Sequence, residues 1–179
     1  MRMVLIGPPG AGKGTQANQL AAHYHIPHIS TGEMLRHEVR EGTDIGKKVA
    51  ACLAAGNLVS DELMLGMVEH RLQMNDALSG FVLDGFPRST YQAEGLQRLM
   101  ERLQRPLQAV VQLVIPDDEI VSRLKDRRVC SACGKIYHLV HRPPQQAGLC
   151  DLDGAPLGQR DDDTEESIRN RLSVYHRQT

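Results

Sequence analysis

The first residues that could do chemistry form a glycine-rich loop around one lysine, Gly7-Pro8-Pro9-Gly10-Ala11-Gly12-Lys13-Gly14-Thr15. An apolar run precedes this loop, and apolar residues at helical spacing follow it. Glycines let the backbone turn several N–H groups toward one anion, and a helix start adds its positive end. Lys13 adds a mobile cation. We therefore predict a phosphate-binding loop, with an ordinary glycine turn as the alternative.

The loop departs from the general phosphate-binding pattern immediately after its lysine. The pattern places Ser or Thr there, where the hydroxyl binds Mg²⁺. This chain has Gly14 instead, and the hydroxyl comes one residue later at Thr15. We therefore expect Mg²⁺ to be bound mostly by phosphates and water.

A second informative stretch is Asp84-Gly85-Phe86-Pro87-Arg88. Asp84 ends a predicted strand, at the sheet edge where open α/β folds bind their ligands. A carboxylate opposite a phosphate loop is a suitable anchor for hydrated Mg²⁺. Arg88 is a planar cation that suits a transferred phosphoryl group, and Gln92 lies one helical turn later. The alternative is that Asp84 only caps a turn.

Further anion-binding residues follow the second predicted strand. Ser30 and Glu33 form a capping box, which predicts a helix starting near Thr31. Thr31 and Arg36 lie in its first two turns, where a hydroxyl and a guanidinium can bind a small anion. A solvated surface charge is the alternative for Arg36.

Four of the arginines in the second half of the chain are further candidates for anion binding. Arg123 and Arg127 are four residues apart, so on one helix face they would repel each other without an anion between them. Arg160 and Arg171 flank the predicted start of the last helix and could supply two cations to a phosphate chain. Surface solvation is again the alternative for each.

Three of the four cysteines lie within residues 130–150. A C-x-x-C pair and a C-x-x-D pair can together close a tetrahedron around Zn²⁺. The predicted ligands are Cys130, Cys133, Cys150 and Asp153. His138 and His141 are alternatives for the fourth ligand, and free thiols are the alternative to a metal. Four protein ligands would make the zinc structural.

Strands and helices alternate in the predicted element order. Short apolar runs predict strands at 1–6, 26–30 and 81–83, and a central strand at 109–115. Helices are predicted between them, including one capped by Asp117. The alternation indicates a parallel sheet flanked by helices with right-handed crossovers. Residues 129–160 break the pattern and are predicted to form a small inserted module.

Size and charge restrict the class of protein. With 179 residues, the chain fits one domain, and a net charge of −1 argues against nucleic-acid binding. No apolar run is long enough to span a membrane, and no signal segment opens the chain. We expect a soluble, cytoplasmic monomer.

Together these stretches resemble adenylate kinase, in its long bacterial form with a zinc-bearing lid. The resemblance covers essentially the whole chain, and its motifs are 7–15, 30–36, 84–88, 127–129 and 160–163 with Arg171. It implies a P-loop fold with inserted AMP-binding and lid subdomains. It also implies the Mg²⁺-dependent reaction ATP + AMP ⇌ 2 ADP, which serves nucleotide biosynthesis and adenine nucleotide homeostasis.

The resemblance also implies residue roles. The expected ATP-binding residues are Gly10, Ala11, Gly12, Lys13, Gly14, Thr15, Arg123, Arg127, Ile136 and Tyr137. The expected AMP-binding residues are Thr31, Arg36, Asn57, Leu58, Val59, Gly85, Phe86, Pro87, Arg88, Gln92, Arg160 and Arg171. The residues expected around the transferred phosphoryl group and its metal are Lys13, Asp84, Arg88, Arg123, Arg160 and Arg171. Asp162 and Asp163 would position lid arginines.

By the same resemblance, residues 1–179 form one kinase domain, with an AMP-binding insertion at 30–59 and a lid at 126–163. The family continues with a further strand and helix after the position of Thr179, so we expect either a truncated chain or a four-stranded sheet with an exposed edge. The alternative functions are a UMP/CMP-type kinase and a catalytically impaired nucleotide-binding fragment.

Overall fold

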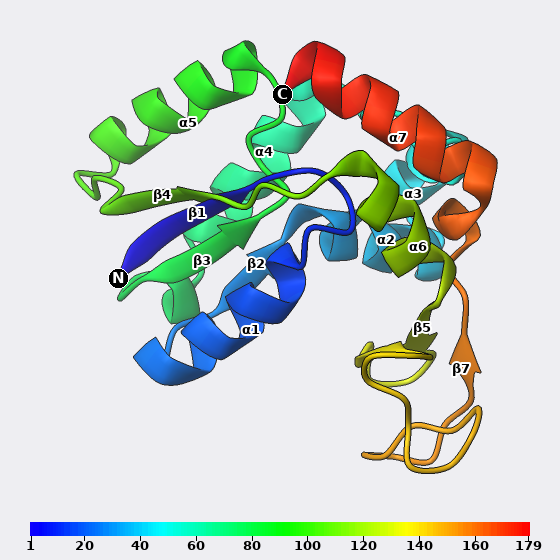
Figure 1. Ribbon diagram of the computed structural model, residues 1–179. Coiled ribbons are helices and arrows are strands. Elements are labelled where there is room, and N and C mark those ends of the chain that lie inside the picture. Colours follow the sequence, from blue (N-terminus) through cyan, green and yellow to red (C-terminus); the bar gives the residue numbers. More distant parts are fainter.

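Four parallel strands form the central sheet of the computed structural model, which describes residues 1–179 (Figure 1). They are β1 (Arg2–Ile6), β2 (His28–Ser30), β3 (Phe81–Asp84) and β4 (Ala109–Gln112). Their order is β2-β3-β1-β4, and Leu5 of β1 pairs with Asp84 of β3. The glycine loop after β1 and the carboxylate ending β3 therefore lie at the same edge of the sheet, as predicted.

Seven α-helices and two short 3₁₀ helices, η1 and η2, surround the strands. They are α1 (Lys13–Tyr24), α2 (Thr31–Arg40), α3 (Asp44–Ala54), α4 (Asp61–Leu72), η1 (Asn75–Ala77), α5 (Thr90–Arg102), α6 (Asp117–Lys125), η2 (Asp161–Asp163) and α7 (Glu165–Gln178). None of these helices has the length and hydrophobicity needed to cross a membrane.

Hydroxyl side chains fix several helix starts. Thr43 accepts the backbone N–H of Gly46 at 3.0 Å, and Ser89 accepts that of Gln92 at 3.2 Å. The predicted cap at Asp117 is wrong, because Pro116 occupies that position and no side chain caps α6. Asp117 is the first helical residue and contacts His176 of α7 instead.

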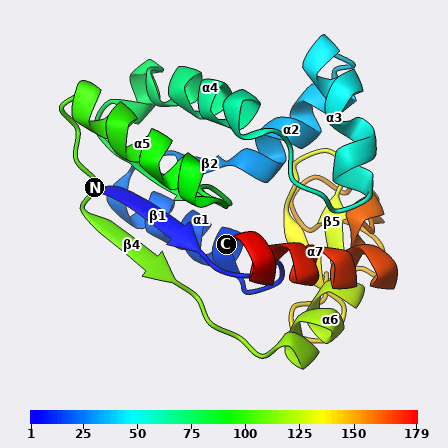
Figure 2. The same cartoon turned by 90° about the horizontal axis from the view of Figure 1, so that it is seen from above.

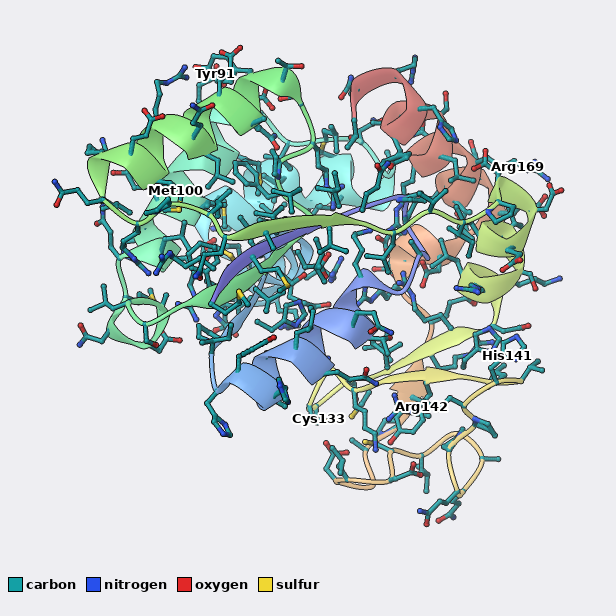
Figure 3. The ribbon with its side chains drawn as sticks, turned by 60° about the vertical axis from the view of Figure 1, so that its left-hand side comes forward. Tyr91, Met100, Cys133, His141, Arg142 and Arg169 are labelled. Carbon is teal, nitrogen blue, oxygen red and sulfur yellow. The ribbon has the colours of Figure 1, made fainter.

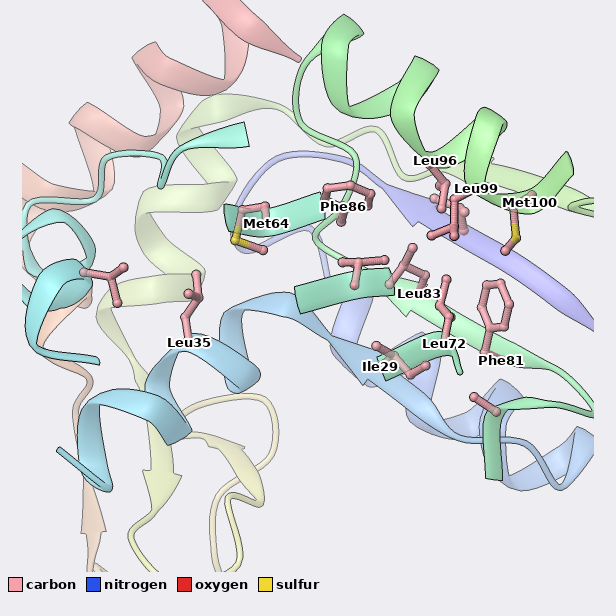
Figure 4. Packing of buried hydrophobic residues seen from close by; sticks show 14 residues of the cluster. Ile29, Leu35, Met64, Leu72, Phe81, Leu83, Phe86, Leu96, Leu99 and Met100 are labelled. Carbon is pink, nitrogen blue, oxygen red and sulfur yellow. The ribbon is translucent and has the colours of Figure 1, made fainter. Parts of the chain in front are cut away.

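The hydrophobic core lies on both faces of the sheet. On one face, Val4, Phe81 and Leu83 pack with buried residues of α2, α4 and α5 (Figure 4). On the other, Leu5 and Val82 pack with Ala17 of α1. Alternate residues of β1 and β3 thus point to opposite layers, and this double burial makes the two strands a rigid support for the loops that follow them.

The strand predicted at 109–115 forms in part, as Ala109–Gln112, but the prediction that it is central is wrong. β4 is shorter and forms an edge of the sheet, with β1 as its only neighbour (Figure 2). Val110 is 58% exposed and Val114 is 85% exposed. A run of β-branched residues fits any strand position, so composition alone did not distinguish an edge from a centre.

A second, antiparallel sheet stands apart from the first, below α6 in Figure 1. Its strands are β5 (Arg127–Cys130), β6 (Ile136–His138) and β7 (Leu157–Gly158), in the order β6-β5-β7. Buried Cys130, Tyr137 and Cys150 form its own small core. The segment predicted as an inserted module is therefore a separate packing unit.

Candidate functional site

The glycine loop wraps around the side chain of Lys13. Gly10 and Gly12 have positive φ values of 79° and 89°, which side chains rarely adopt. A Cβ on Gly7 would lie 2.6 Å from the carbonyl oxygen of Leu113, so only glycine fits there. The Lys13 ammonium donates hydrogen bonds to the carbonyls of Gly7 and Pro8, both at 2.8 Å.

The electrostatics of Lys13 indicate a site for an anion. Burial lowers the pKa of Lys13 to about 8, against the opposing effect of Asp84. Arg88, Arg171 and Arg127 lower the pKa further, because they add positive charge nearby. The fold therefore brings four cations together, and a ligand with several negative charges would relieve their repulsion.

Asp84 faces the loop at the position where the general pattern has a hydroxyl. An ideal Cβ on Gly14 would lie 3.5 Å from Asp84 Oδ2, an ordinary van der Waals contact, so the carboxylate lies directly beside the residue that follows Lys13. Asp84 is 8% exposed, and His28 Nε2 lies 3.4 Å from its Oδ2. The sequence analysis missed His28, because nothing in a three-residue strand marks one histidine as a partner of a distant aspartate.

The turn after Asp84 places Arg88. The carbonyl of Gly85 accepts hydrogen bonds from the Thr31 hydroxyl at 2.9 Å and from Arg88 Nε at 2.7 Å. Gln92 is 2% exposed and accepts the backbone N–H of Arg88 at 2.7 Å, while its amide donates to Asp61 at 2.7 Å. Gln92 is itself held by Asp61 and thus keeps the Arg88 backbone in place.

Glu33 joins two arginines from distant parts of the chain. Its Oε1 accepts hydrogen bonds from Arg36 at 2.7 Å and from Arg160 of the segment before η2. Burial alone would raise the pKa of Glu33, but Arg36 and Arg160 lower it below the usual value. Only half of the predicted capping box forms: Ser30 accepts the Glu33 N–H at 3.5 Å, while the Glu33 side chain binds arginines.

Two aspartates hold the remaining site arginines. Asp163 accepts two hydrogen bonds from Arg127, at 2.8 and 2.5 Å, and one from Arg171 at 3.3 Å. Asp162 lies 3.1 Å from Arg171. Burial lowers the pKa of Arg160 to about 10, and that of Arg88 also to about 10. Asp163 thus contacts one lid arginine, Arg127, as expected, whereas Asp162 contacts Arg171, which lies outside the predicted lid.

One cleft brings the predicted segments together. Its walls come from the glycine loop, the connector after α3, the turn after β3 and helix α7. The residues of the predicted site that line it are Gly7, Pro9, Lys13, Leu58, Gly85, Phe86, Pro87, Arg88 and Arg171.

Other predicted residues lie outside this cleft. Arg123 is exposed and pairs with Glu119 of its own helix at 3.1 Å. Because α6 ends at Lys125, Arg123 and Arg127 do not share a helix face, and that interpretation is wrong. Ile136 and Tyr137 lie in the second sheet. Asn57 lies in the connector, where its side chain accepts a hydrogen bond from Asn170 at 2.9 Å.

The predicted metal ligands cluster in the second sheet. The ligand atoms of Cys130, Cys133, Cys150 and Asp153 all lie within 4.8 Å of one another. Hydrogen bonds from cysteine thiols lower the pKa of Asp153 to about 2, so its carboxylate is ionised at neutral pH. Three sulfurs and one carboxylate around a common point fit a tetrahedral Zn²⁺ site.

The two alternative histidine ligands lie elsewhere. His138 Nδ1 accepts the backbone N–H groups of Val140 and His141, at 3.2 and 3.1 Å. Figure 3 shows Cys133 at one end of the second sheet and His141 near the other. Asp153 is therefore the residue that completes the cluster.

Arg88, Arg171 and Arg127 converge with Lys13 on the N-terminus of α1. A ligand with several negative charges would account for this arrangement. The parallel sheet, the glycine loop and the cleft define a P-loop phosphotransferase. Comparison with known sequences gives the family. The model of the family "Adenylate kinase" matches residues 5–179.

Individual relatives agree with the family match. The adenylate kinase of Trichlorobacter lovleyi is 52% identical to this chain over 179 residues, which is 100% of this chain and 84% of the relative. That of Oceanobacillus iheyensis is 49% identical, over 100% of this chain and 83% of the relative. That of Archaeoglobus fulgidus is 48% identical, over 100% and 82%. The chain belongs to the adenylate kinase family.

Proposed function

We propose that this protein catalyses reversible transfer of the terminal phosphoryl group of ATP to AMP, giving two ADP. The observation that carries the proposal is the shared cleft, in which Lys13 of the glycine loop, Arg88 and Arg171 face one space. Phosphoryl transfer requires in-line positioning and neutralisation of charge more than covalent participation by the protein. Convergent cations from several segments supply both.

The proposed roles follow the two sides of the cleft. On the loop side, the backbone N–H groups of residues 10–15 and the Lys13 ammonium bind the ATP phosphates. On the other side, Thr31, Arg36 and Arg88 bind AMP. Gly85 fixes the side chain of Arg88, and Gln92 fixes its backbone. Mg²⁺ bound with ATP would neutralise phosphate charge, and Asp84 is the carboxylate placed to bind its water.

Two segments are proposed to move as units. Residues 30–59, with α2 and α3, form the AMP-binding insertion, and residues 126–163 form a lid with its own sheet and core. Closure of the lid would carry Arg127 and the Ile136-Tyr137 strand toward ATP. Closure also excludes water, which would otherwise compete with AMP for the phosphoryl group.

We further propose that the lid binds one structural Zn²⁺ through Cys130, Cys133, Cys150 and Asp153. The support is the donor set and its compact arrangement. Four protein ligands leave no open coordination position, so the zinc would stabilise the small lid core rather than take part in transfer.

The proposed setting is a cytoplasmic enzyme of nucleotide biosynthesis and adenine nucleotide homeostasis, acting as a monomer. Light scattering tests this point, and a stable dimer at working concentrations would contradict it.

The decisive experiment is ADP formation from ATP and a panel of nucleoside monophosphates. We expect AMP to be the preferred acceptor and Lys13→Met to lower kcat/KM by at least about a hundredfold, since it removes the central cation. Equal or faster use of UMP or CMP would replace the AMP assignment. ATP binding without AMP-dependent ADP production would indicate a catalytically impaired nucleotide-binding protein.

A further inference from the structure

Tyr137 is the largest fully buried side chain of the lid, although it carries a polar hydroxyl. Its ring fills the small core between Cys130 and Cys150. A phenylalanine would supply the same apolar ring, whereas a buried phenol requires a hydrogen-bond partner. The hydroxyl group therefore needs its own explanation.

The contacts of this hydroxyl fix the direction of its proton. The backbone N–H of Asp151 donates a hydrogen bond to the Tyr137 oxygen at 2.7 Å. Because an amide N–H can only donate, the phenolic oxygen is the acceptor there. Cys150 Sγ lies 3.4 Å from the same oxygen. The phenolic proton is thus free to point at the sulfur, which accepts it most strongly as a thiolate.

A cation, the Lys135 ammonium, also restrains the Tyr137 ring. The Lys135 ammonium lies 5.0 Å from the centroid of the Tyr137 ring and 3.8 Å from the Asp151 carboxylate. These contacts link Lys135, Tyr137 and the residue that follows Cys150. The ring therefore has little freedom to turn its hydroxyl away from the sulfur.

We propose that Tyr137 is a positioning residue of the metal centre, whose hydroxyl donates a hydrogen bond to the Cys150 thiolate and orients it toward the zinc. This inference rests on the proposed zinc site. Tyr137 lies in β6, paired with Arg128 of β5. The same side chain therefore connects the metal centre to the strand that is expected to face ATP.

The test compares Tyr137→Phe with the unsubstituted protein in a zinc competition against a chromophoric chelator. Loss of an outer hydrogen bond to a metal ligand typically weakens metal binding by about 10–100-fold. We expect a zinc dissociation constant at least about tenfold larger for Tyr137→Phe. The matched control is Tyr91→Phe, at a tyrosine that is 48% exposed on α5, and its zinc affinity should not change.

A cobalt-loaded sample provides a spectroscopic signature. A hydrogen bond stabilises the sulfur lone pairs, so its loss should move the thiolate-to-cobalt charge-transfer band to longer wavelength. The intensity of the d–d bands should persist, because the four ligands remain. A further measurement needs no variant: zinc binding should perturb the tyrosine absorption of the unsubstituted protein, since a thiolate then replaces a thiol as the acceptor.

The outcomes separate the two hypotheses. If the unsubstituted protein binds no zinc, both the metal site and the role of Tyr137 are wrong. If it binds zinc, but Tyr137→Phe retains the same affinity and band position, only the role of Tyr137 is wrong. An unchanged tyrosine absorption on zinc binding would also contradict that role.

Discussion

At the scale of single residues, Lys13 shows how the loop prepares for its ligand. Its ammonium is bound by two loop carbonyls and surrounded by arginines that carry the same charge. Carbonyl groups compensate only part of the cost of burying a cation, so the pKa of Lys13 is lowered to about 8. Polyphosphate would supply the missing negative charge and raise this pKa again.

Proton uptake is therefore expected when ATP binds. Near pH 8 the free protein holds Lys13 partly deprotonated, since its pKa is about 8, whereas the bound lysine would be fully protonated. Affinity for ATP should accordingly fall as the pH rises above this value. Calorimetric titrations at pH 8 in buffers with different protonation enthalpies should give different apparent binding heats.

Lys13→Arg is the matched control, because a guanidinium keeps the charge and stays protonated in this range. Its binding heat should be the same in all buffers. Identical heats for the unsubstituted protein would show that Lys13 is already fully protonated before ATP binds.

At the scale of elements, the aspartates of η2 fasten the lid strand β5 to the final helix. The Asp163 side chain is fully buried and accepts hydrogen bonds from Arg127 of β5 and Arg171 of α7. Arg127 and Arg171 lie 36 and 8 residues away from Asp163 in the sequence, so this connection joins two separate elements. Its strength depends on the carboxylate charge, since both partners are cations.

Asp163→Asn should destabilise the protein by about 3 kcal/mol, because it removes the carboxylate that pairs with the partly buried Arg127 and one of the two that pair with Arg171. Urea unfolding followed by circular dichroism measures this change. Asp161→Asn is the control, since Asp161 is exposed, and it should change the free energy of unfolding by less than about 0.5 kcal/mol. A similar small effect for Asp163→Asn would show that the ion pairs contribute little.

The elements also show what could be predicted from the sequence. The strand-loop-helix unit at Lys13 and the cysteine pairs are local patterns, and their spacing correctly predicted a glycine loop before a helix and a Cys/Asp cluster that could hold a metal. The contacts of Glu33 with Arg160 and of Gln92 with Asp61 join residues 127 and 31 positions apart. Acids and arginines are common, so the choice of partners depends on the folded chain and was not visible beforehand.

At the scale of the whole molecule, the proposed lid has a hydrophobic core separate from those around the parallel sheet. Its three buried members are Cys130, Tyr137 and Cys150, and two of them are proposed zinc ligands. So small a core gives little stability without a metal. Zinc is therefore expected to stabilise the lid while contributing little to the sheet.

Cys150→Ala should lose zinc, and scanning calorimetry should then show a lid transition at lower temperature while the main transition persists. Cys52→Ala is the control for metal content, because Cys52 lies outside the cluster and its thiol contacts the Leu58 carbonyl at 3.0 Å. A Cys150→Ala protein with full zinc content and an unchanged melting profile would refute the metal site.

The shared carboxylate of Glu33 has a consequence for how the enzyme responds to salt. Arg36 and Arg160 already carry a built-in counter-ion, held at high local concentration by the chain itself. An arriving monophosphate would exchange with this tethered group rather than with mobile chloride. Ionic strength should thus influence capture of the acceptor nucleotide less than the number of cations in the cleft would imply.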